Sequence, residues 1–259
     1  MCIQHSRLRQ PAVKPEQASL SLIGLVQSPR IFSLDELRRL PHETKRLTLV
    51  CTARPLNAKY WDTRAWAGVP FPALLEAAGV LPEARSVQTA GYDGTVRNFA
   101  LDDLRHALLA VEVDGRALSA VQGFPVRLLI PGRSACVMPR FVQRIAFRAD
   151  VADACDAATP LAAIERVQAT VDGVRLEGLA LAADSVAVRL DDGPAVAVAV
   201  SGQEDGLAGR WSLDWPGADV NRARFSADAA LTAQPEARPL ARRWKAQRAS
   251  WTPARNPEP

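Results

Sequence analysis

The fold of this chain is decided by two stretches, LTLVC at residues 47–51 and WAGVPFPALLEAAGV at residues 66–80. The first is a short apolar run of the kind that forms a buried strand, and Cys51 closes it. The second predicts a helix at residues 70–78 that ends at Gly79, the residue type preferred after the last helical turn. A thiol at the end of a buried strand has a rigid support, so Cys51 is a candidate ligand for a soft metal ion. A buried structural thiol is the alternative interpretation.

The composition is that of a globular protein, with 48% hydrophobic and 23% charged residues. A length of 259 residues favours two domains. No window approaches the about 18 consecutive apolar residues of a membrane helix, so we expect no membrane partner. The first eleven residues lack the apolar core of a signal peptide. We therefore expect a cytoplasmic protein, or a periplasmic one if the true start lies upstream.

The charge pattern favours an anion site over a nucleic-acid surface. The net charge is +4, and much of the excess is arginine, but no basic stripe with groove-reading elements is present. We therefore expect no nucleic-acid partner. Guanidinium groups hold oxyanions at two points, so an arginine-lined pocket for a small anion fits the same charge. The four cysteines, at positions 2, 51, 136 and 155, form no CxxC pair, which argues against a zinc finger.

The two halves of the chain differ in texture. In the first half, Ser33 and Glu36 have capping-box spacing before a short helix at residues 34–40, and residues 52–64 are predicted to form an irregular loop. Strands are predicted at residues 19–26, 47–51, 86–89, 96–101, 108–113, 126–130 and 141–147. Short strands mixed with short helices predict an α+β fold for residues 1–155.

Residues 150–163 are rich in alanine and aspartate and are predicted to form a linker. Six short strands are predicted after it, at residues 167–170, 175–180, 186–190, 195–200, 209–215 and 221–226. Asp-Gly and Pro-Gly turns separate several of them, and helical periodicity is absent. This spacing predicts a β-sandwich for residues 156–259.

Several blocks, in this order, resemble the sulfite oxidase family of molybdenum enzymes. The blocks in the first half are IGLV at residues 23–26, LTLVC at 47–51, WAGV at 66–69, which resembles the W-x-G-V helix of the family, GYDG at 91–94 and GFPVRL at 123–128 with PG at 131–132. WSLDW at residues 211–215 and RAR at 222–224 resemble the C-terminal immunoglobulin-like dimerisation domain. The resemblance implies a mixed α/β molybdopterin-binding domain at residues 1–155, followed by an immunoglobulin-like β-sandwich with a C-terminal tail at residues 156–259.

The resemblance also implies a chemistry. Cys51 would bind the metal of a molybdenum-molybdopterin cofactor, and the cofactor would perform a two-electron step. Arg54 and Arg127 are the candidate catalytic residues that hold a small anionic substrate, sulfite by default. Cofactor binding is assigned to Arg97, Arg133 and Arg140 together with Cys51. For each arginine taken alone, a solvated surface charge is the alternative interpretation. Without a C-x-x-C-H haem motif, the electron acceptor is expected to be a separate molecule such as a cytochrome, and a homodimer is expected.

A second hypothesis comes from the departures from the family pattern. Thr95 stands where a tyrosine is usual, Gln122 where a histidine is usual, and Arg140-Phe141 where Lys-Trp is usual. The alternative is therefore a degenerate member without redox activity that serves as a binding or assembly module.

Overall fold

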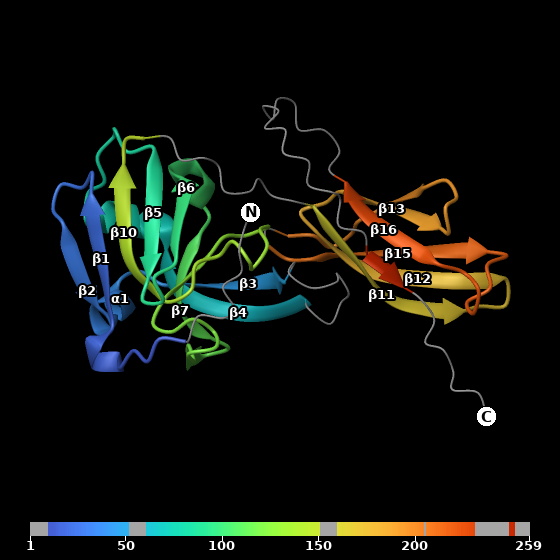
Figure 1. Cartoon of the computed structure of the whole chain (residues 1–259), viewed down its shortest axis with the longest axis horizontal. Helices are drawn as coiled ribbons and strands as arrows, with labels where there is room; N and C mark the ends of the chain where they lie inside the picture. The colour runs from blue at the N-terminus through green and yellow to red at the C-terminus, as the bar shows by residue number, and fades with distance from the viewer. Residues whose placement is uncertain (1–9, 52–60, 151–159, 205, 231–248, 252–259) are drawn as a thin grey trace. The chain divides into compact units, whose positions relative to one another are not determined.

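The computed structural model describes residues 10–51, 61–150, 160–204, 206–230 and 249–251 (Figure 1). None of the helices in these ranges is long and apolar enough to cross a membrane. The chain divides into two compact units. The first comprises Met1–Leu47 and Thr63–Ala157, and the second comprises Thr48–Asp62 and Ala158–Pro259. The predicted boundary at residues 155/156 lies outside the described residues and stays a prediction.

Two β-sheets carry most of the first unit, so this part of the chain is mostly β with few helices. One sheet has the order β2-β1-β10-β5-β6, and the other has the order β3-β4-β7-β8 with β9 paired to β7 (Figure 1). The strands of the first sheet are β2 (Arg30–Ser33), β1 (Ser19–Gly24), β10 (Val142–Arg148), β5 (Ser86–Gly91) and β6 (Val96–Ala100). Those of the second are β3 (Glu43–Val50), β4 (Trp61–Pro70), β7 (Leu108–Val113), β8 (Arg116–Ala117) and β9 (Arg127–Leu129). The end of β3 from Thr48 and the start of β4 up to Asp62 belong to the second unit. The helical elements are η1 (Pro15–Gln17), α1 (Leu34–Arg39), α2 (Phe71–Ala78) and η3 (Leu101–Leu104).

The helix predictions for α1 and α2 are confirmed to within one residue. Ser33 accepts a hydrogen bond from the Glu36 backbone at 3.2 Å, and the Glu36 carboxylate accepts one from the Ser33 N–H at 2.8 Å. This reciprocal pair satisfies donors that the first turn leaves unpaired. Gly79 ends α2 in the left-handed conformation, with φ of 58°.

Both sheets and α2 contribute to one apolar core. Leu22, Val87 and Ile145 come from the first sheet and are fully buried, while Leu109 and Leu128 come from the second. Every strand pairing of the first sheet is antiparallel except that of β1 with β10, which is parallel. The core therefore fixes both sheets around α2, and β9 is held at one side of β7.

The interpretation of WAGV as part of a helix was wrong, and so was the predicted loop at residues 61–64; the rest of that loop, residues 52–60, lies outside the described residues. Residues 61–70 form one strand, and the helix begins only at Phe71. Gly68 lies opposite Ala110 of β7 at an irregularity in the register, where a Cβ would come within 2.0 Å of the Leu109 carbonyl oxygen. Only glycine permits so close an approach of two backbones. Gly68 of this block therefore allows β4 and β7 to pair at this close distance.

The second unit consists of two sheets around their own core. Their orders are β11-β12-β15 and β14-β13-β16-β17, and both contribute to a cluster that includes Leu176, Val186, Trp211 and Phe225. The bounds are β11 (Leu161–Ala169), β12 (Gly173–Leu181), β15 (Gly209–Pro216), β14 (Val196–Ala199), β13 (Ser185–Leu190), β16 (Phe225–Ala230) and β17 (Ala249–Trp251). The observed pairing is that of two antiparallel sheets packed face to face.

Two predictions in the second unit were wrong in their bounds: the end of the linker and the start of the last predicted strand. The predicted linker runs to residue 163, but β11 begins at Leu161, whose side chain is buried with Leu181. The strand predicted at residues 221–226 begins only at Phe225. Asp219 explains the delay, because its side chain accepts from the Asn221 N–H at 2.9 Å and its carbonyl accepts from the Ala223 N–H at 2.9 Å. These bonds form a turn before the strand.

Candidate functional site

Cys51 directly follows the last residue of β3 and is half-buried. It is not in a disulfide. The preceding Val50 is fully buried and packs with Leu161, Leu181 and Trp61, all of which belong to the second unit. The structure thus confirms that this thiol lies at the end of a buried strand. Its role as a metal ligand remains a prediction.

Arg127 is a buried cation in β9, with 9% of its surface exposed. Its Nη1 donates to the Gln122 carbonyl at 3.2 Å, while its Nε has no acceptor among the described residues. The guanidinium carbon lies 5.4 Å from the ring centre of Trp66 in β4, and the Trp66 indole N–H also has no acceptor in the described part. Burial and the nearby charge of Arg140 lower the pKa of Arg127 to about 10. Two buried donor groups thus lie beside each other, and no oxygen among the described residues accepts from them.

Arg140 adds a second positive charge to this cluster. It is half-buried, its Nη1 donates to the Val121 carbonyl at 3.4 Å, and its guanidinium carbon lies 5.3 Å from the Phe141 ring centre. The next residue, Phe141, has a φ of 58°, which is uncommon for a bulky side chain. Its N–H donates to the Gly123 carbonyl at 3.1 Å, so this backbone is held beside the segment that leads into β9. We call Arg127, Arg140 and Trp66 the arginine cluster.

Arg133 is buried for a different reason. Its Nη2 lies 3.1 Å from the Asp103 carboxylate in η3, and its side chain is 10% exposed. A buried guanidinium beside a carboxylate is already charge-compensated. The structure therefore shows a structural ion pair at Arg133, and its predicted contact with a cofactor stays a prediction.

The Arg133–Asp103 pair leads to a stability prediction. Asp103→Asn is expected to lower the free energy of unfolding by about 2–3 kcal/mol, because the change leaves a buried cation without its anion. Chemical denaturation measures this. The neighbouring Asp102→Asn is a matched control, since the Asp102–Arg105 pair is exposed and should be worth less than about 1 kcal/mol. Equal losses in the two variants would contradict the structural role of the buried pair.

The remaining predicted arginines do not join the cluster by any described contact. Arg97 lies on the edge strand β6, where its Nη1 donates to the neighbouring Val96 carbonyl at 3.2 Å. Arg64 in β4 forms an exposed pair with Asp114 at 2.9 Å. Arg54 lies outside the described residues. Of the predicted arginines, the structure thus brings together Arg127 and Arg140.

Two features of the site were missed from sequence. Trp66 is buried and lies against the Arg127 guanidinium, a contact that the sequence did not predict. The Gln122 side chain accepts from the Ser119 N–H at 2.8 Å and from the Ser119 hydroxyl at 2.9 Å. Ser119 and Gln122 have the spacing of a capping box, and this pattern predicts the contact between them.

The donor set fits an anionic cofactor that brings its own sulfur ligands. No group of three or more His, Cys, Asp or Glu residues that could hold a metal ion exists within the described ranges. A cofactor with a dithiolene needs only one protein thiolate, and Cys51 is half-buried at a rigid strand end. The unsatisfied Nε of Arg127 and the indole N–H of Trp66 are donors for an oxyanion. Taken within its own unit, each of these groups is of a kind that molybdenum-molybdopterin binds: a thiolate for the metal, and buried donors for an oxyanion.

Comparison with known proteins agrees with this donor set. The profile of the family described as "Oxidoreductase molybdopterin binding domain" matches residues 7–155, more than half of the chain. Nitrate reductase [NADH] 2 of Phaseolus vulgaris is 27% identical over 165 residues, which cover 52% of this chain and 18% of that protein. Inducible nitrate reductase [NADH] 1 of Glycine max is 26% identical over 165 residues, or 52% of this chain and 19% of that protein. The chain thus matches less than a fifth of the length of these relatives.

A solved structure shares the fold over most of the chain. The sulfane dehydrogenase SoxCD from Paracoccus pantotrophus superimposes with a TM-score of 0.69, covering 85% of this chain and 68% of that chain, at 20% identity. At this identity the likeness concerns the fold alone. The family profile, the nitrate reductase relatives and the donor set together imply a molybdenum-molybdopterin cofactor. On the profile match to residues 7–155, this chain belongs to the oxidoreductase molybdopterin binding domain family.

Proposed function

We propose that this protein is a molybdenum-dependent oxidoreductase of sulfite oxidase type that acts on a small oxyanion, with sulfite as the first candidate. Its electrons pass to an external acceptor such as a cytochrome. The observation that carries the proposal is the arginine cluster. Among the described residues, the buried Arg127 guanidinium has a donor without an acceptor, and its charged neighbour is Arg140 rather than a carboxylate. Such a cluster is costly unless an anion binds to it.

The side chains divide the work as follows. Cys51 holds the metal through its thiolate, and the bound cofactor supplies the two-electron step. Arg127 and Arg140 bind and orient the anion, and the buried indole of Trp66 keeps water from one face of the Arg127 guanidinium. Low water access strengthens each charge-assisted hydrogen bond to the anion.

Turnover assays distinguish between the small oxyanions that are candidate substrates. Two relatives are named nitrate reductases and a structure of the same fold is named a sulfane dehydrogenase. Sulfite and nitrate are both small oxyanions that an arginine fork binds, but sulfite gives up two electrons and nitrate accepts two. The direction of electron flow therefore separates these candidates.

The experiment is a metal count followed by turnover assays on protein made in a host that makes the cofactor. We expect molybdenum near one atom per chain and sulfite-dependent reduction of a one-electron acceptor such as ferricyanide or cytochrome c. Nitrate, an S-oxide and an N-oxide with a reduced dye test the reverse direction. Turnover of nitrate alone would replace sulfite as the substrate, and no turnover of any compound by fully loaded protein would overturn the enzyme proposal.

A non-redox binding or assembly module is the second candidate, and specific contacts favour it. Gln122, at the position usual for a histidine, uses its side chain to bind Ser119. Thr95, at the position usual for a tyrosine, donates its hydroxyl to Asp93 at 2.8 Å. Both side chains thus have structural partners. Stoichiometric molybdenum with measurable turnover would exclude this candidate.

We also propose that the second unit is an immunoglobulin-like domain through which two copies associate. Support comes from its two antiparallel sheets packed on one core. Light scattering of the purified chain measures its mass in solution, and a monomer at all concentrations would contradict the dimer.

A further inference from the structure

Thr48 in β3 forms two hydrogen bonds with a loop far along the chain, one as donor and one as acceptor. Its N–H donates to the Gly206 carbonyl at 2.9 Å, and its hydroxyl oxygen accepts from the Ala208 N–H at 3.0 Å. Thr48 is 3% exposed, so water does not replace these partners easily. It lies three residues before Cys51. All of these residues belong to the second unit.

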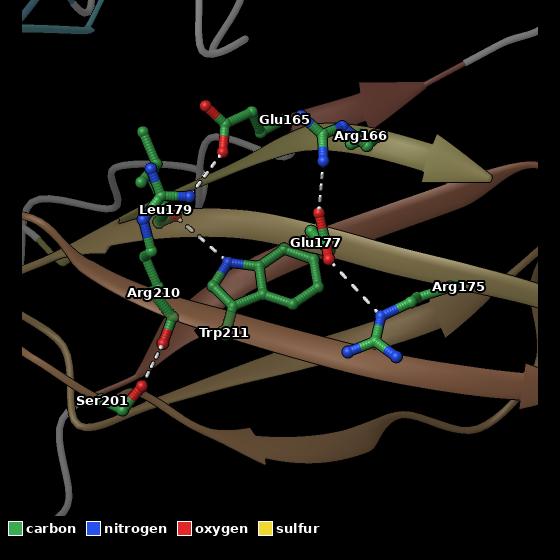
Figure 2. A network of polar contacts seen from close by, with 8 residues as sticks. All are labelled: Glu165, Arg166, Arg175, Glu177, Leu179, Ser201, Arg210 and Trp211. Atoms are coloured by element: carbon green, nitrogen blue, oxygen red, sulfur yellow. Dashed lines mark hydrogen bonds and ion pairs between the residues drawn. The ribbon is translucent and has the colours of Figure 1, made fainter.

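The base of this loop is firmly anchored (Figure 2). Ser201 and Arg210 exchange two backbone hydrogen bonds at 2.8 Å each, and the Ser201 hydroxyl donates to the Arg210 carbonyl at 3.2 Å. The Arg210 guanidinium pairs with Glu165 of β11 at 2.9 Å, and the Trp211 indole N–H donates to the Leu179 carbonyl at 3.2 Å. Gly206 and Ala208 therefore extend from a base fixed to two neighbouring strands.

A second contact fixes the chain between Thr48 and the thiol. Val50 is fully buried against Leu161 and Leu181. With Thr48 held by hydrogen bonds and Val50 held by packing, the strand end has two attachment points on the second unit within three residues of Cys51. A ligand is held precisely in place only where its supporting residues are themselves fixed.

We propose that Thr48 is a positioning residue for the metal ligand, and that the Gly206–Ala208 loop holds Cys51 at the required place through it. This inference rests on the proposed ligation of molybdenum by Cys51. The hydroxyl of Thr48 is the atom that matters, because it satisfies the Ala208 N–H. Valine has the shape of threonine without that acceptor, and serine keeps the acceptor without the methyl group.

The first test uses the full chain without cofactor, where thiol alkylation reports how often the strand end opens. Thr48→Val is expected to raise the alkylation rate of Cys51 about tenfold, the factor that the loss of one buried hydrogen bond produces. Thr48→Ser should keep the rate near that of the wild type. Cys136, the other half-buried cysteine that the structure describes, is the internal reference, and peptide mapping separates it from Cys51. Its rate should not change.

The second test uses protein loaded with cofactor. Thr48→Val is expected to reduce molybdenum per chain and to lower the sulfur count at the metal measured by X-ray absorption, and Thr48→Ser should restore both. Ser33→Ala is the control for a general loss of stability, since it removes a helix cap in the first unit. It should leave the metal site unchanged. If Thr48→Val does not fold, the smaller Thr48→Ala serves instead.

Two outcomes would overturn the positioning role of Thr48 without overturning the ligation of molybdenum by Cys51, and a third would overturn both. An unchanged Cys51 alkylation rate in Thr48→Val would overturn the positioning role, whatever the metal does. Faster alkylation together with an unchanged sulfur count at the metal would also overturn it. If Cys51→Ser itself leaves the metal environment unaltered, then the proposed ligation fails and the positioning role fails with it.

Discussion

Cys51→Ser is expected to abolish turnover and to remove one sulfur ligand from the metal. A hydroxyl is a harder ligand than a thiolate and stays protonated at neutral pH, so it does not replace the sulfur. The substitution is nearly isosteric and Cys51 is only half-buried, so the fold should persist. Turnover, molybdenum per chain and X-ray absorption at the metal measure these effects.

Cys136→Ser is the matched control for this variant. Cys136 is also half-buried and outside any disulfide, and its N–H donates to the Ser134 hydroxyl at 3.2 Å. We expect it to keep full activity and metal content. Undiminished activity in Cys51→Ser, or an equal loss in both variants, would show that Cys51 is not the ligand.

Arg127→Met is expected to have opposite effects on stability and on anion binding. In the protein without cofactor, the variant should be more stable by about 1–3 kcal/mol at neutral pH, because it removes a buried charge with no carboxylate beside it among the described residues. Anion binding should weaken about 10- to 100-fold, which corresponds to the loss of a charge-assisted hydrogen bond. Methionine keeps the unbranched apolar stem of the side chain and removes the guanidinium that lies beside Trp66.

The pH dependence of this gain follows from the direction of the pKa shift. The folded pKa of Arg127, about 10, is below its ordinary value, so the native state disfavours the charged form. The penalty is fully present well below pH 10 and declines as pH rises above about 10 towards the ordinary pKa of arginine. The stability advantage of Arg127→Met should thus be constant near neutral pH and shrink above about pH 10. Denaturation at pH 7 and pH 10.5 tests this.

Metal content and KM of Arg127→Met tell which anion the arginine holds. A raised KM with normal molybdenum content indicates the substrate, and a reduced molybdenum content indicates the cofactor. Arg64→Met is a matched control, because the Arg64–Asp114 pair is exposed. Unchanged KM, metal content and stability in Arg127→Met would refute the anion site.

Local signals in the sequence predicted much of the fold. The capping box at Ser33 and the apolar helix ending at Gly79 depend on neighbours in sequence, and both are confirmed. The strand at residues 61–70 was missed because its pairing with β7 depends on tertiary contacts, and the two prolines nearby favour an irregular or helical reading. Its key feature, the close approach at Gly68, comes from a strand some forty residues later in the chain.

The candidate site was only partly predictable for the same reason. Cys51 was identified from its own strand, and Arg127 from the GFPVRL block at residues 123–128, which resembles the sulfite oxidase family. Which arginines have carboxylate partners is not written in local sequence: Asp103 compensates Arg133 from thirty residues away, while Arg127 has another cation nearby. The Thr48 contacts come from a loop 160 residues later and had no local signal.

That separation of 160 residues has a consequence for the order of biosynthesis. A ribosome makes the chain from its N-terminus, so the Cys51 strand end is complete long before the Gly206–Ala208 loop exists. Until that loop has emerged, the Thr48 hydroxyl and N–H lack these two hydrogen-bond partners, and the strand end lacks the support that they give. Stable loading of the cofactor is therefore a late event that follows synthesis of the C-terminal half.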